Sequence, residues 1–195
     1  MRSSHFQTLI GRILLATGQF EDAMMTLRDV LDRQRRLFGQ SHPAIADTLS
    51  YIGQCYLDQE RHTEARAMYV ECYNIRKEFF TVDQVHIAES MVDIIRARPG
   101  QPERALALYV NAMEVYKEYL ADDHVLIARL MLYKGDSHAE MLNFPSSIES
   151  YDSAEKIFHN RLGLLSTESA LVSVSIGKYL HLVLKKHPVS QIPYF

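Results

Sequence analysis

The residues of this sequence best suited to chemistry are nine histidines, two cysteines and one short acidic run. Asp122, Asp123 and His124 are consecutive, and both carboxylates and imidazoles are common metal ligands. A metal site needs further ligands at a fixed spacing, however. The sequence has no His-Glu-x-x-His, no Cys-x-x-Cys and no glycine-rich phosphate loop. We therefore predict no catalytic site, no metal site and no cofactor, and we expect that the chain is not an enzyme.

The same residues have simpler structural interpretations. His42 and His124 each precede a segment with helical periodicity, where a single local hydrogen bond is enough to explain them. Asp122 and Asp123 are interpreted as caps of that helix start, because the helix dipole favours negative charge there. Cys72 is predicted to be a small buried residue. Two cysteines make no disulfide framework, and reduced thiols indicate a cytoplasmic location.

Composition and charge exclude several kinds of partner. The formal net charge is −3, from 21 basic and 24 acidic residues spread along the chain. Without a Lys/Arg block there is no source for long-range attraction to a phosphate backbone, so we expect no nucleic acid partner. No apolar run approaches the roughly 18 residues that a membrane span needs, so we expect no membrane insertion. Residues 1–20 have the composition of a transit peptide, but the alternative that they form the first helix is favoured by the repeat register below.

The chain contains an internal repeat of 42 residues. Gly11 and Gly53 are 42 residues apart, and so are Ala23 and Ala65. The spacing shortens to 40 once, around residues 98–102, and then returns to 42. A period of this length predicts stacked repeats. We expect one domain over residues 1–186 and a tail at 187–195, the domain being divided into repeats at about 4–41, 42–83, 84–123 and 124–166 and a half repeat at 167–186.

Each repeat divides into two helices joined by a short turn. The turns are predicted at residues 17–19, 58–60, 99–100 and 143–145. The second helix of each repeat carries a small residue and, four positions later, Leu or Tyr, which indicates close packing against the first helix. Gly39 and Gly163 suit the left-handed position after a helix, and Ser41 with Pro43 suits the start of the next one.

These residues carry a resemblance to a known family. The pattern Gly-x2-Tyr, Ala-x3-Tyr and a helix-starting proline resembles the tetratricopeptide repeat, and here it is seen in Gly53 with Tyr56, Ala65 with Tyr69, and Pro43. The family's usual period is about 34 residues. The longer period here, with the joint sequence FGQSHPAIA at residues 38–46, resembles the kinesin light chain and nephrocystin type. The resemblance implies an all-α fold, a right-handed superhelix of four long helical hairpins plus a C-terminal helix.

The resemblance also implies a concave groove lined by the first helix of each repeat. Kinesin light chains carry paired asparagines there, but the matching pairs in this sequence are Thr8-Leu9, Ser50-Tyr51, Val92-Asp93 and Leu132-Tyr133. The family's cargo specificity therefore cannot be transferred. We expect Tyr51 and Tyr133 to be aromatic anchors and Arg12, Arg96 and Arg129 to contact carboxylates of the partner. The candidate groove residues are Arg12, Tyr51, Gln54, Asp93, Arg96, Arg129, Tyr133 and Asp136.

From this resemblance we expect a non-catalytic adaptor or scaffold that binds a partner peptide or helix, located in the cytoplasm with the cytoskeleton or the cilium. One alternative is a self-associating structural module. Its homodimer contact would be the apolar helix at about residues 167–186, covered by a second copy, by residues 192–195 or by chain outside this sequence. Another alternative is a regulatory segment of a larger protein.

Overall fold

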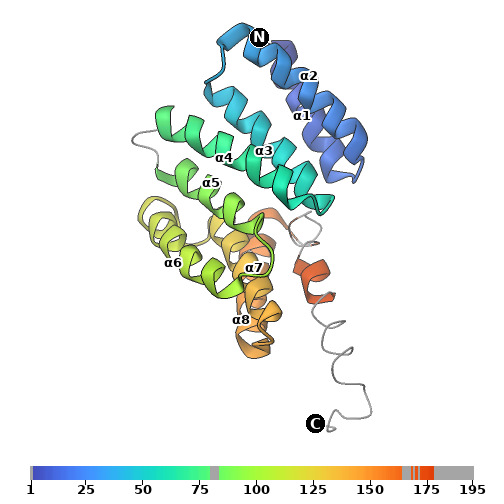
Figure 1. Ribbon diagram of the computed structural model, residues 1–195. Coiled ribbons are helices and arrows are strands. Elements are labelled where there is room, and N and C mark those ends of the chain that lie inside the picture. The colour runs from blue at the N-terminus through green and yellow to red at the C-terminus, as the bar shows by residue number, and fades with distance from the viewer. Residues whose placement is uncertain (1, 80–83, 164–167, 169, 171, 178–195) are drawn as a thin grey trace. The chain divides into compact units, whose positions relative to one another are not determined.

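The described residues of the computed structural model, 2–79, 84–163, 168, 170 and 172–177, form α-helices and connecting turns and contain no strand (Figure 1). Side chains are described from Phe6 onward. The predicted all-α fold is confirmed. The helices are α1 (Arg2–Ala16), α2 (Phe20–Phe38), α3 (Pro43–Asp58), α4 (His62–Phe79), α5 (Gln84–Arg96), α6 (Pro102–Tyr119), α7 (Val125–Glu140) and α8 (Phe144–Leu162), with further helical residues at 172–177.

The chain divides into two compact units, Met1–Pro99 and Gly100–Phe195. In unit 1 each helix packs against the next one along the chain, from α1 to α5. In unit 2, α6 packs against α7 and α7 against α8. The predicted single domain over residues 1–186 stays a prediction. Much of the predicted terminal helix at 167–186, and the whole tail at 187–195, lie outside the described residues.

The turn inside each repeat depends on one residue with a left-handed backbone. Gly18 and Gly100 have φ of 75° and 77°. At the same repeat position Glu60 and Leu142 have φ of 59° and 61°, which costs free energy for a residue with a side chain. The predicted Gly39 and Gly163 are confirmed as left-handed, with φ of 82° and 85°.

A glycine of the first helix touches the bulky residue of the second helix. A methyl group on Gly11 would lie 2.7 Å from Cδ2 of Leu27, and one on Gly53 would lie 2.7 Å from Cε1 of Tyr69. Gly135 faces the ring of Tyr151 in the same way. A side chain at these positions would force Leu27, Tyr69 or Tyr151 to shift from its place between the two helices. This contact explains why glycine occupies this position in the first, second and fourth repeats, whereas the third repeat has Ile95 there.

Two of the joints between repeats, before α3 and before α7, are capped by histidine. His42 Nδ1 accepts a hydrogen bond from the Ala44 amide at 3.1 Å, and His124 Nδ1 accepts one from the Leu126 amide at 3.2 Å. The structural interpretation of both histidines is therefore confirmed. The expected caps Ser41, Asp122 and Asp123 are wrong, because a histidine occupies the capping position at both joints. Ser41 donates instead to Glu78 at 2.6 Å, and Asp123 pairs with Arg161.

Across the residues that the structure describes, no three His, Cys, Asp or Glu side chains gather in a way that could hold a metal ion. Of the helices in this part of the chain, none has the length and apolar character needed to cross a bilayer.

The glycine contact can be tested by a double-mutant cycle. Gly53→Ala should lower the free energy of unfolding by about 1–3 kcal/mol, since overpacking the Tyr69 ring outweighs the better helix propensity of alanine. When Tyr69→Ala has already removed the ring, adding Gly53→Ala should be neutral or stabilising. Urea unfolding followed by circular dichroism measures both. Equal losses in the two backgrounds would show that the ring does not require the glycine.

Candidate functional site

The candidate residues of unit 1 come from α1, α3 and α5, and the structure brings several of them together. The Arg12 guanidinium lies over the Tyr51 ring, 5.2 Å from its centroid, so that α1 and α3 share a cation–π contact. Burial raises the pKa of the Tyr51 phenol, and Arg12 partly opposes this shift. Arg12 is exposed while Tyr51 is half-buried. The pair therefore presents a cation that is stacked on a half-buried aromatic ring.

A second set of contacts joins α3 to α5. Gln54 Oε1 accepts a hydrogen bond from Arg96 Nη1 at 3.2 Å, and its amide donates to Asp58 Oδ1 at 2.7 Å. Arg96 also pairs with Asp93 Oδ1 at 3.3 Å. The Tyr69 hydroxyl reaches Gln54 Oε1 at 3.4 Å from the second helix of the same repeat. Gln54, Asp93 and Arg96 therefore form one polar line across two first helices.

Asp93 is electrostatically unusual within this line. Burial raises the pKa of its carboxyl to about 6; Arg96 opposes the rise, and Glu89 adds to it. The ionised form is thus held at a cost that the Arg96 contact only partly offsets.

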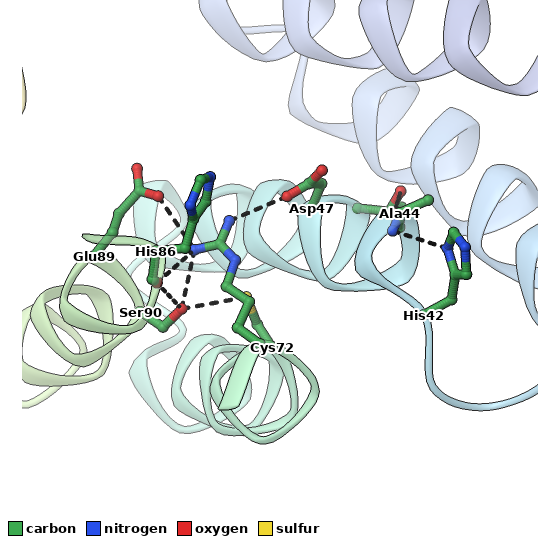
Figure 2. A network of polar contacts seen from close by, with 9 residues as sticks. His42, Ala44, Asp47, Cys72, His86, Glu89 and Ser90 are labelled. Atoms are coloured by element: carbon green, nitrogen blue, oxygen red, sulfur yellow. Dashed lines mark hydrogen bonds and ion pairs between the residues drawn. The ribbon is translucent and has the colours of Figure 1, made fainter. Parts of the chain in front are cut away.

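An arginine that the sequence analysis missed lies beside this line. Arg76 of α4 has a side chain only 5% exposed, yet it carries a charge. Its Nη2 lies 3.2 Å from Asp47 Oδ1 on α3, and its Nη1 lies 3.2 Å from Glu89 Oε2 on α5. Figure 2 shows Asp47 and Glu89 on opposite sides of the network. A forked guanidinium thus bridges carboxylates of two successive repeats.

The same arginine also satisfies neutral groups. Its Nη1 donates to Ser90 Oγ at 3.0 Å and to the His86 carbonyl oxygen at 3.3 Å (Figure 2). Ser90 Oγ lies 3.7 Å from the sulfur of Cys72, which is buried as predicted. Burial raises the pKa of the Cys72 thiol to about 11, so it is not a thiolate nucleophile at neutral pH. The sequence did contain a signal for Arg76. It is a charged residue at an inward-facing repeat position, which is occupied by Gln34 and Tyr116 in the neighbouring repeats.

The candidates of unit 2 contact residues of their own unit. Arg129 Nη2 lies 3.1 Å from Glu168 Oε1, and the Tyr133 ring lies 6.4 Å from that of Tyr109 between centroids. Asp136 Oδ1 accepts a hydrogen bond from the Tyr151 hydroxyl at 2.8 Å. The proposal that these residues share one groove with Arg12, Tyr51, Gln54, Asp93 and Arg96 stays a prediction.

The bridging role of Arg76 predicts that lysine cannot replace it. Arg76→Lys keeps the charge, but one ammonium cannot serve Asp47 and Glu89 with the same fork geometry. We expect a loss of about 1–2 kcal/mol in the free energy of unfolding. Arg66→Lys, at an exposed position of the same helix, is the matched control. If the two variants unfold at the same urea concentration, the bridge contributes nothing.

The raised pKa of Asp93 predicts a stability gain on acidification. The folded chain holds the proton more tightly than the ordinary carboxyl with its pKa of 3.8, so stability from this group rises as the pH falls through about 6 toward 4. Asp93→Asn should therefore be more stable than the parent at pH 7, and the difference should shrink by pH 4.5. Chemical unfolding at the two pH values measures it.

Glu64→Gln provides a contrast of opposite sign. The hydrogen bond from Arg61 lowers the pKa of the Glu64 carboxyl. The contribution of this carboxylate to the free energy of unfolding is therefore present above the ordinary pKa of glutamate and is lost as the pH falls through the lowered pKa. A difference between Asp93→Asn and the parent that is independent of pH would contradict the assignment.

The chain is similar to known proteins in part of its sequence and in its fold. Residues 4–78 match the tetratricopeptide repeat family. No curated protein matches the chain in sequence. The crystal structure of a kinesin light chain candidate from Podosopora anserina, with nearly identical TPR-like repeats, superposes with a TM-score of 0.61 at 15% identity. That alignment covers 94% of this chain and 96% of the other chain.

A variant of the same fungal protein, in which methionine replaces one glutamine, gives an equal result. Its TM-score is 0.61 at 15% identity over 93% of this chain and 95% of that one. At this identity the likeness concerns the fold alone. Residues 4–78 are thus similar in sequence to the tetratricopeptide repeat, and the chain has the fold of TPR-like repeats.

Proposed function

We propose that this chain is a non-catalytic protein-interaction module, which binds a peptide or helix of a partner protein across the face formed by α1, α3 and α5. Repeats of this kind build extended surfaces for protein binding. By analogy with the kinesin light chain-like neighbours, the proposed role is that of an adaptor in the cytoplasm, in cytoskeletal or ciliary assemblies. The proposal requires no cofactor.

The observation that supports the proposal most is the Arg12–Tyr51 pair. Arg12 is exposed, and no carboxylate of the described residues is paired with it. Stacking on Tyr51 occupies the face of the guanidinium and leaves its N–H edges available. Such N–H edges donate two hydrogen bonds to a carboxylate in a bidentate geometry, and the stacking on the Tyr51 ring reduces the entropy lost on binding. The ligand group that fits is therefore an acidic side chain or a C-terminal carboxylate.

Preorganisation of the neighbouring helices supports the same proposal. The Arg76 bridge and the Gln54–Arg96 hydrogen bond fix α5 against α3 before any partner arrives. A surface whose side chains already hold their positions loses less free energy on binding than a mobile one.

The proposal can be tested with peptides selected from a random peptide phage library on the immobilised 195-residue chain. Fluorescence anisotropy then measures the affinity of each selected peptide for variants of the chain. Tyr51→Ala and Arg12→Met should each weaken binding about tenfold, because hot spots concentrate in aromatic and arginine side chains. Peptides rich in Asp or Glu should dominate the selection.

Arg33→Met is the matched control, since Arg33 is an exposed arginine of α2 that pairs with Asp29. Its affinity should equal that of the parent. Peptides that bind all four proteins equally would show that this face is not the binding surface, and a selection without Asp or Glu would refute the role of Arg12.

A further inference from the structure

The first helices of unit 1 carry opposite charges at two repeat positions. Arg12 and Arg96 share one position, and Asp47 and Glu89 share another that lies seven residues earlier in the repeat. Two residues with this separation lie on nearly the same side of a helix, about 10 Å apart along its axis. We call Arg12 and Arg96 the basic row and Asp47 and Glu89 the acidic row.

The acidic row carries more negative charge than its own cation balances. Both carboxylates share the buried Arg76, whose Nη2 lies 3.2 Å from Asp47 Oδ1 and whose Nη1 lies 3.2 Å from Glu89 Oε2 (Figure 2). In the described part of the chain no second cation pairs with either carboxylate. The Asp47 side chain is 58% exposed, whereas that of Glu89 is 29% exposed. The unbalanced negative charge therefore reaches the surface mainly at Asp47.

Tyr51 lies between the two rows. Asp47 precedes Tyr51 by four residues on the same side of α3, and Arg12 of α1 lies over the Tyr51 ring, 5.2 Å from its centroid. Burial raises the pKa of the Tyr51 phenol; Arg12 opposes this rise, and Asp47 and Glu89 add to it. One half-buried ring is thus flanked by charges of opposite sign. Within the described residues Arg12 forms no ion pair with Asp47 or Glu89.

We propose that this face binds an extended segment of a partner protein in which an acidic residue and a basic residue are neighbours. The acidic side chain contacts Arg12, and the basic one contacts Asp47. Charge complementarity favours this occupant, because the acidic row repels a segment with acids alone and Arg12 repels one with bases alone. Neighbouring side chains of an extended chain point to opposite sides, as two rows on opposite sides of Tyr51 require.

This inference rests on the proposed function and adds a specificity-determining residue to it. Arg12 selects peptides that carry a carboxylate, and Asp47 selects among them those that carry a base beside it. Loss of the Asp47 charge should therefore relax the choice of peptide without abolishing binding.

Two selections from the random peptide phage library, one on the parent chain and one on Asp47→Asn, test this specificity. Asparagine keeps an oxygen for the Arg76 guanidinium but removes the charge. On the parent, Lys or Arg should be enriched directly beside Asp or Glu. On Asp47→Asn the acids should remain, and the enrichment of the base should disappear. Acidic peptides selected on the parent without a neighbouring base would overturn this inference and leave the proposed function standing.

A double-mutant cycle measures the contact itself. The probe is the tightest peptide from the parent selection, labelled with fluorescein, and a second peptide has its neighbouring Lys or Arg replaced by Met. In fluorescence anisotropy, Asp47→Asn should weaken binding of the first peptide about threefold, as expected for an exposed ion pair, and leave the second unchanged. A purely structural role of Asp47 through Arg76 would weaken both peptides equally and would overturn the inference.

Asp29→Asn is the matched control, since Asp29 is an exposed carboxylate of α2 that pairs with Arg33 at 2.6 Å. This variant should bind the first peptide as the parent does. Urea unfolding checks that Asp47→Asn is folded under the conditions of the binding measurement. If Asp47→Asn binds both peptides like the parent, the inference is wrong. Tyr51→Ala separates it from the proposed function, which fails as well if that variant also binds like the parent.

Discussion

The contact between a glycine of one helix and a ring or branched side chain of the next is the constraint on which the packing of α1 on α2, α3 on α4 and α7 on α8 depends. It sets the distance between the two helices of a hairpin at Gly11, Gly53 and Gly135. Because the second helix is tied so closely to the first on one side, its other side is left to meet the next repeat.

Successive repeats are joined in two chemically different ways. Between α2 and α3 the junction is largely apolar, with one buried hydrogen bond from Thr48 to Gln34. Between α4 and α5 the junction contains the buried cation of Arg76, whose partners Glu89 and Ser90 lie on α5 and whose partner Asp47 lies on α3. A buried ion pair contributes little net stability against a well-packed apolar alternative, but it is satisfied in only one register. The register of α5 on α4 is thus determined more by the geometry of the Arg76 contacts than by the burial of apolar surface.

The sequence predicts the architecture of this protein well, because architecture depends on periodic residue types. The 42-residue period located the turns, the hairpins and the left-handed Gly39 and Gly163. What it could not predict are contacts between side chains of residues far apart in the chain, such as Arg12 on Tyr51 or Arg96 on Gln54, since these depend on rotamers and on the packing of three helices together. It also missed local choices between equivalent chemistries. Histidine caps the helices for which Ser41 and Asp123 were expected as caps. Glu60 and Leu142 have a positive φ, a backbone conformation that glycine adopts most readily.

The polar residue that follows each glycine is coupled to the core behind it. Gln54 and Asp136 hold this position where the second helix supplies a tyrosine, and each accepts the hydroxyl of that tyrosine. In the first repeat Leu27 has no hydroxyl to offer, and Arg12, at the same position, lies instead over the neighbouring repeat. An array of this kind can therefore change what its surface displays without any substitution on that surface. Replacing a buried tyrosine by leucine removes the hydroxyl that donates to the polar residue on the first helix. That polar residue can then contact other groups, so a substitution in the core can change binding specificity at the surface.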